Sequence, residues 1–268
     1  MMKSHGKHGL SFVLVFVVVA GLIMSGAIAP DFALAGKAYH KIGPIHLYPH
    51  GQKYGRTYHK TAPVHLPAYD QTYGELTGDW WQWLRSIPAD VLAPDGKSPG
   101  HPLIAEGKMD CSLNQPDGPV WFLAGTESGD ATRSCIVPEK KALFFPLVNA
   151  VFYNAEGEDY TVAEKREALN DFLKLACRLD STLDGTPTVY YSNTVRTQSP
   201  TFLLETATPD IWGEDGLIDP EAVADGFWVM IPPLDKGKHV LQSTGSVCDP
   251  DTGEPWFTVD VTYNLFVR

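Results

Sequence analysis

The sequence lacks the short motifs by which many enzymes are recognised. It contains no HExxH pair, no GxxxxGK[ST] phosphate-binding loop and no GxGxxG turn. Its single GxSxG match, residues 96–100, lies in a stretch rich in Pro, Gly and Asp, where no strand-to-helix elbow is expected. These observations argue against a recognisable serine hydrolase, zinc peptidase or nucleotide-binding protein. Histidine is also scarce in the main part of the chain, where His101 and His239 alone follow residue 70. The shortage limits any mechanism that depends on an imidazole base.

Paired carboxylates remain available as catalytic chemistry, because glycoside hydrolysis needs two acids and no histidine. Acids lie next to aromatic residues at Asp79, Glu205 and Asp210. A chain with 32 acidic residues produces such neighbours by chance. We therefore name no catalytic residue from the sequence.

Long hydrophobic runs are absent after the N-terminal region, so no later segment is apolar enough to span a membrane. The one long run, residues 10–24, follows Lys3 and Lys7 and precedes the small-x-small triplet Ala33-Leu34-Ala35. This pattern predicts a signal peptide over residues 1–35 and a secreted, periplasmic or cell-surface protein. The alternative is an uncleaved anchor, because residues 10–28 together approach the ~20 residues that span a bilayer. Contact with a membrane is expected only in that case.

The four cysteines show no CxxC or CxxH spacing, which argues against the alternative of a zinc site. An even set of cysteines in an oxidising compartment predicts disulfides. Of the possible pairings we favour Cys111 with Cys135 and Cys177 with Cys248. The first pair would then bracket a hairpin, and the second would tie a helix to the C-terminal strands.

Acidic residues are absent from residues 36–69, which carry five basic side chains. This segment is rich in Tyr, His, Pro and Gly without helical or strand periodicity, so we expect an extended linker. From Asp70 onward 14 basic and 31 acidic side chains give a net charge of −17. Such a body repels phosphates, which argues against a nucleic acid or an anionic membrane as partner.

The linker contains a two-copy repeat, in which residues 39–47 return as residues 58–66. Neutral imidazoles on such a segment can bind Zn, Cu or Ni, and the two copies offer two similar half-sites. The alternative is a basic, pH-responsive tether that contacts a cell wall or nothing, since this histidine spacing is a weak ligand pattern. The histidines concerned are His40, His46, His59 and His65.

Residues 70–268 are expected to form a single disulfide-containing, β-rich domain that opens with a helix. After Thr77-Gly78-Asp79, large apolar side chains recur at the i, i+3, i+4, i+7 spacing of one helical face, and Pro88 ends the helix. Trp81 falls off this face, so we expect its indole to contact a ligand. The face consists of Trp80, Trp83, Leu84 and Ile87.

Three apolar runs of strand length lie within residues 118–149, each closed by Gly, Pro, Asn or charged residues. They predict consecutive antiparallel strands at the centre of a sheet. The third run contains Pro146, which cannot donate a backbone hydrogen bond, so we expect a bulge or an edge position there.

The rest of the body combines one more helix with further strands. A capping box at Thr161 and Glu164 predicts a helix that continues to about Leu179. Several strand-like runs follow, and the last, residues 257–267, alternates cleanly between apolar and polar side chains. The fold class is therefore mainly β, a β-sandwich or jelly-roll-like antiparallel body with two helical insertions.

A turn directly after Cys248 carries three carboxylates, from Asp249, Asp251 and Glu254. Calcium prefers oxygen ligands and the spacing partly follows D-x-D-x-G, so the turn is a candidate calcium site. It does not complete the twelve-residue EF-hand pattern. We therefore favour the alternative of an ordinary acidic hairpin turn.

Four segments resemble those of a group of secreted microbial proteins of uncharacterised activity. They are Trp80-Trp81-Gln82-Trp83, residues 118–126, residues 141–149 and the closing strand that begins near Gly237-Lys238-His239. The resemblance covers most of residues 70–268 and implies an exported β-rich domain, without implying an activity.

Export, disulfides, a β-architecture and abundant Trp and Tyr favour a non-enzymatic extracellular or cell-surface domain. We expect it to bind a glycan, a wall polymer or another protein through one face of a sandwich. Calcium at the acidic turn is the candidate cofactor. One alternative is a secreted carbohydrate-active enzyme with two catalytic carboxylates. The other is metal binding through the His-rich repeat.

Overall fold

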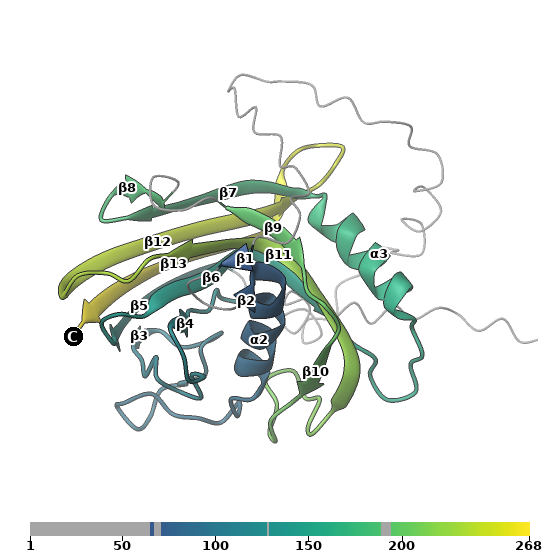
Figure 1. The fold of residues 1–268 in the computed structure, drawn as a ribbon, viewed down its shortest axis with the longest axis horizontal. Coiled ribbons are helices and arrows are strands. Elements are labelled where there is room, and N and C mark those ends of the chain that lie inside the picture. The colour runs from purple at the N-terminus through teal and green to yellow at the C-terminus, as the bar shows by residue number, and fades with distance from the viewer. Residues whose placement is uncertain (1–64, 67–70, 128, 189–193) are drawn as a thin grey trace, which may run out of the picture.

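The computed structural model describes residues 65–66, 71–127, 129–188 and 194–268 (Figure 1). The predicted signal peptide, most of the predicted linker, and His40, His46 and His59 lie outside the described residues. His65, at the end of the second repeat copy, belongs to a short strand that pairs with residues 71–72. The described structure therefore begins before residue 70, the predicted start of the body.

The described secondary structure consists mainly of strands. The helices are α2 (Tyr73–Arg85) and α3 (Val162–Leu173). The strands are β1 (His65–Leu66), β2 (Gln71–Thr72), β3 (Gly107–Lys108), β4 (Val120–Phe122), β5 (Gly129–Val137), β6 (Ala142–Phe152), β7 (Ala176–Leu183), β8 (Thr186–Pro187), β9 (Val195–Gln198), β10 (Phe202–Glu205), β11 (Ile218–Ile231), β12 (Gly237–Cys248) and β13 (Pro255–Val267).

Two sheets pack face to face as a sandwich, with one layer above the other in Figure 1. The six-stranded sheet has the order β3-β5-β13-β12-β7-β8, and the five-stranded sheet has the order β10-β11-β6-β4, with β9 also paired to β11. Strand accounts for 45% of the structure and helix for 14%. The prediction of a mainly β sandwich with two helices is therefore confirmed.

The predicted arrangement of the three runs within residues 118–149 is wrong. β4 and β6 lie in the five-stranded sheet and pair in parallel, whereas β5 lies in the other sheet and pairs in parallel with β13. The turn at Lys140, which has a positive φ of 65°, carries the chain from one sheet to the other. Consecutive strands with a short connection can thus cross between layers instead of forming a hairpin.

The bulge predicted near Pro146 is confirmed. Phe227 of β11 pairs with Val148 and Trp228 pairs with Pro146, so Leu147 is the extra residue in β6. At this point β12 of the opposite sheet presents Gly245, and a Cβ there would collide with the Leu147 carbonyl oxygen. The two sheets can approach so closely only because this residue has no side chain.

Two apolar layers stabilise the sandwich. The first lies between the sheets and includes Val261 and Leu265 of β13, whose predicted alternation the burial pattern follows along the whole strand. The second lies between the five-stranded sheet and α2, and it contains Trp80, Trp81 and Trp228. Because α2 covers one face of β6 and the other sheet covers the opposite face, β6 is buried on both sides, which explains its continuous apolar sequence.

Both helices open with a capping box. For α2 the box is formed by Thr72 and Glu75, so the helix begins earlier than predicted, although its predicted apolar face is buried. For α3 the predicted box of Thr161 and Glu164 is confirmed. The predicted end near Leu179 is wrong, because the chain leaves the helix after Leu173 and residues 176–183 form β7.

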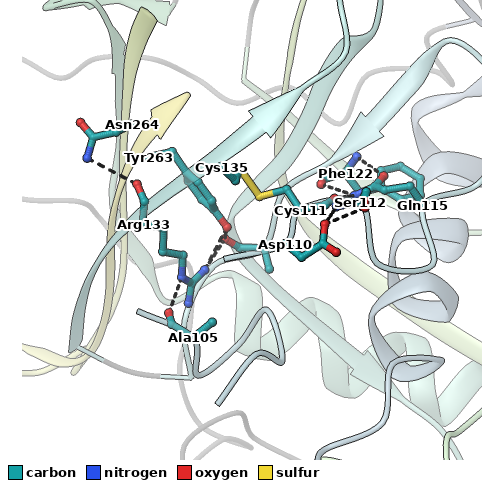
Figure 2. Close-up of a disulfide and its surroundings, with 11 residues drawn as sticks. Ala105, Asp110, Cys111, Ser112, Gln115, Phe122, Arg133, Cys135, Tyr263 and Asn264 are labelled. Atoms are coloured by element: carbon teal, nitrogen blue, oxygen red, sulfur yellow. Dashed lines mark hydrogen bonds between the residues drawn. A yellow bond between two sulfur atoms is a disulfide. The ribbon is translucent and has the colours of Figure 1, made fainter. Parts of the chain in front are cut away.

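Both predicted disulfide pairings are confirmed, with Cα–Cα distances of 5.8 Å. Their structural roles differ from the prediction. Cys111 lies in the loop before β4 and joins Cys135 of β5, so the bond ties a loop to the six-stranded sheet instead of bracketing a hairpin (Figure 2). Cys177 and Cys248 lie on the neighbouring strands β7 and β12, so the bond joins two strands, not a helix and a strand.

Candidate functional site

Helix α2 directs two long side chains toward the five-stranded sheet. Trp81 and Arg85 are four residues apart and therefore lie on the same helical face. Trp81 has 1% of its surface exposed, so its position off the predicted apolar face does not bring it to the protein surface. The second apolar layer contains Trp81 as well as the predicted apolar face, so the buried face of α2 is wider than the residue spacing predicts. Contact between Trp81 and a ligand stays a prediction.

Arg85 forms a fully buried ion pair with Asp210, which lies 125 residues away in the chain. The guanidinium Nε and Nη2 donate to the two carboxylate oxygens at 2.9 Å each. Asp210 also accepts hydrogen bonds from the backbone N–H groups of Trp212 and Glu214. One buried carboxylate therefore neutralises the arginine and shapes the loop that carries Trp212.

The indole of Trp212 is partly exposed and held from two sides. Its ring lies over the Arg85 guanidinium at 4.2 Å from carbon to ring centroid, a cation–π distance. Its Nε1 donates to Glu127 Oε1 at 3.1 Å. Tyr153 lies against the same guanidinium, and Trp81 contacts the Trp212 ring. The ring of Trp212 is thus fixed in position before any ligand arrives.

Two partly buried carboxylates have a raised pKa: Glu127, which accepts from the indole, and Glu214, which lies close to the Arg85 charge. Burial raises the pKa of Glu127, and the hydrogen bond from Trp212 partly offsets that effect. Burial also raises the pKa of Glu214, against the opposing influence of the Arg85 charge. We call the whole group the Trp212 cluster: Trp81, Arg85, Glu127, Tyr153, Asp210, Trp212 and Glu214.

The loop that carries Glu127 is anchored by a second buried arginine. Arg133 of β5 donates to the carbonyl oxygens of Ala105, Ala124 and Gly125 and to the Tyr263 hydroxyl. Figure 2 shows this side chain beside Tyr263 and near the Cys111–Cys135 disulfide. The Ala124 and Gly125 carbonyls immediately precede Thr126 and Glu127, so Arg133 positions the carboxylate that binds the Trp212 indole.

His101 is fully buried close to the two arginines. Burial lowers the pKa of its imidazole to about 4, and both arginine charges act in the same direction. The ring contacts the Leu84 carbonyl oxygen through Nε2, and Nδ1 accepts from the Leu103 N–H. His101 is therefore a neutral structural group near neutral pH.

A small cavity lies next to the cluster, lined by Trp81, Thr126 and Asn149 among others. Its volume is about 20 Å³. Ligand pockets for drug-sized molecules measure about 300 to 1,000 Å³, whereas one water needs roughly 10 to 15 Å³. The cavity can hold one or two non-hydrogen atoms and cannot enclose a sugar ring.

The predicted calcium turn is the hairpin between β12 and β13. Asp249 Oδ1 accepts the backbone N–H groups of Asp251 and Thr252, and this bonding lowers the pKa of the Asp249 carboxyl. Within the described ranges, no three His, Cys, Asp or Glu side chains form a group that could hold a metal ion. Asp249, Asp251 and Glu254 do not converge, and calcium binding stays a prediction from the sequence alone.

Of the predicted metal-binding histidines, His65 alone falls within the described residues, on β1. His40, His46 and His59 lie outside them, so the transition-metal site also stays a prediction. Of the acids noted beside aromatic residues, only Asp210 belongs to the Trp212 cluster. No local feature of the sequence indicates Glu127 or Glu214, because Glu127 meets Trp212, and Glu214 meets the Arg85 charge, only in the folded chain.

Within the part of the chain that the structure describes, no helix is long and apolar enough to cross a membrane. The two disulfides indicate that the protein folds in an oxidising environment. In comparisons with known proteins, no family model matches the chain, and no curated protein matches it significantly.

Proposed function

We propose that the protein is an exported, non-enzymatic domain that binds a glycan, in the cell wall or free, at the Trp212 cluster. The observation that carries this proposal is the partly exposed indole of Trp212, fixed by Glu127 on its N–H and by Arg85 on its ring. Fixing the ring in advance reduces the entropy lost on binding. Sugars offer an apolar ring face for an indole and hydroxyl donors for carboxylates such as Glu127 and Glu214.

A binding role fits the shape of the site better than catalysis does. The adjoining cavity of about 20 Å³ cannot enclose a reacting sugar. A surface aromatic with flanking carboxylates can hold a polymer without enclosing it. Export is supported by the disulfides and by the predicted signal peptide.

Replacing Trp212 by alanine is expected to weaken glycan binding about tenfold to a hundredfold, because burial of a large apolar side chain contributes about 1.5 to 3 kcal/mol. Depletion of the protein from solution by a panel of insoluble and soluble polysaccharides measures the effect. The matched control is Trp256→Ala, since Trp256 is 44% exposed on β13 of the other sheet. The proposal fails if the wild-type protein binds no polysaccharide, or if Trp256→Ala abolishes binding while Trp212→Ala retains it.

The second candidate is a carbohydrate-active enzyme. It is favoured by the raised pKa of Glu127, a property that suits a general acid. Under this alternative Glu127→Gln abolishes sugar release from the same polysaccharides while the protein stays folded. Glu205→Gln is the control, because Glu205 is an exposed carboxylate on β10, near Phe202. If the wild-type protein binds polysaccharide but releases no sugar, the enzymatic alternative is excluded and the binding proposal stands.

A further inference from the structure

The cavity beside the Trp212 cluster has a mouth near that cluster. Its lining is buried except at Gly125 and Asn149, which places the opening there. Gly125 is two residues from Glu127, and the Trp81 ring, another part of the lining, contacts Trp212 at 5.9 Å between centroids. A molecule that rests on Trp212 therefore lies beside the mouth.

Two residues of the cavity lining carry a buried N–H group without a hydrogen-bond partner, at Trp81 Nε1 and Asn149 Nδ2. The other indoles of α2 differ in this respect, because Trp80 donates to the Leu123 carbonyl and Trp83 donates to the Leu113 carbonyl. A buried donor without an acceptor destabilises a folded protein, because it has lost its hydrogen bonds to water. An oxygen atom in the cavity that accepts a hydrogen bond from each of the two donors would remove this destabilisation.

The volume of the cavity limits which molecule or chemical group can supply this oxygen atom. A cavity of about 20 Å³ admits one ordered water in the free protein, or a group of roughly two non-hydrogen atoms. Its other lining residues, such as Leu103 and Val259, are mostly apolar and suit a methylene group. A hydroxymethyl group matches both requirements, with one apolar carbon and one acceptor oxygen.

We infer that this cavity binds the exocyclic hydroxymethyl group of a hexopyranose, with Trp81 and Asn149 as donors to its oxygen. The inference rests on the proposed function and gives it a specificity: glycans of hexoses are bound in preference to glycans of pentopyranoses, which lack this carbon. The hydroxymethyl oxygen replaces the water and reproduces its hydrogen bonds, so displacement of the water incurs little loss.

The test compares oligosaccharides that differ in this group alone. Cellohexaose and xylohexaose share linkage and length, and mannohexaose and galactohexaose extend the hexose set. Calorimetric titration of the protein is expected to give at least one hexose oligosaccharide a Kd about tenfold below that of xylohexaose, because the hydroxymethyl carbon is removed from water and the ordered water is released.

Two variants assign that preference to the cavity. Trp81→Phe removes the N–H donor, and Asn149→Asp replaces the amide donor by an acceptor, so each is expected to reduce the preference below about threefold. Trp121→Phe is the matched control, because Trp121 Nε1 is also buried without a partner but Trp121 does not line the cavity. This variant is expected to keep the full preference.

The outcomes separate the inference from the proposed function. Equal affinity for xylohexaose and the best hexose oligosaccharide overturns the inference and leaves glycan binding in place. A hexose preference that survives Trp81→Phe and Asn149→Asp also overturns it, since the preference then arises outside the cavity. Failure to bind any of the four oligosaccharides or the polysaccharide panel overturns the proposed function, and the inference with it.

Discussion

Replacing Asp210 by alanine is expected to lower the free energy of unfolding by about 3 to 5 kcal/mol. Arg85 and Asp210 have fully buried side chains. Loss of the carboxylate leaves the guanidinium as an uncompensated charge in the apolar layer beneath α2. It also removes the acceptor for the N–H groups of Trp212 and Glu214, so the loop that carries the proposed binding residue loses its support. Urea denaturation, followed by circular dichroism, measures the change.

An exposed ion pair serves as the control for this experiment. Lys174 and Asp171 lie 2.7 Å apart with side chains 59% and 48% exposed. Asp171→Ala is therefore expected to change stability by less than about 0.5 kcal/mol, because water solvates the lysine once its partner is gone.

A double variant tests whether lost charge compensation is the cause. Arg85→Met combined with Asp210→Leu replaces the pair by apolar side chains, and it is expected to recover much of the stability lost in Asp210→Ala. A double variant no more stable than the single variant would contradict this explanation. So would a loss below about 1 kcal/mol in Asp210→Ala.

Replacing Cys177 and Cys248 together by alanine is expected to lower the free energy of unfolding by about 4 kcal/mol. The bond closes a segment of 71 residues and therefore restricts the unfolded chain strongly. It also joins β7 to β12 near the end of α3, where the six-stranded sheet meets the helix. Equilibrium denaturation under non-reducing conditions gives the loss directly.

The other disulfide provides the comparison. Cys111 and Cys135 are separated by 24 positions in the sequence, so their replacement by alanine is expected to lower the free energy of unfolding by about 3 kcal/mol. The two variants are compared at neutral pH and at low pH, where thiol exchange is suppressed. The chain-entropy explanation is contradicted if the variant without Cys177 and Cys248 is the more stable of the two at both pH values.

The Asp210 and disulfide variants test the structure that supports the site, whereas the glycan experiments test its binding surface. Trp212 is useful for binding only if its loop is held in place, and the buried Asp210 holds it. Glu127 depends in the same way on Arg133, which anchors the preceding carbonyls. A variant that loses binding without losing stability therefore points to the surface of Trp212, and one that loses both points to its support.

Much of the local structure could be predicted from the sequence. The capping box of Thr161 and Glu164, the bulge at Pro146 and the alternation of β13 are short-range features, set by side-chain bonding and backbone chemistry within a few residues. Both disulfide pairings were also predicted correctly, although the elements that they join were not.

The candidate site could be predicted only in fragments. The sequence indicated Trp81 as an aromatic candidate and Asp210 as an acid close to an aromatic residue, Trp212. Glu127 and Arg85 did not, because a lone carboxylate or guanidinium has no local signature. Their roles arise from pairings across 85 and 125 residues.

By itself the sequence determined the strand-rich composition, the two helices, their amphipathic faces and an even set of cysteines suited to disulfides. The tertiary structure alone decided which sheet each strand joins, that Trp81 is buried, and which charges meet in the Trp212 cluster. The physical reason is the range of the forces involved. Periodicity and capping act over a few neighbouring residues, whereas sheet membership and buried ion pairs depend on packing between segments that the chain brings together only on folding.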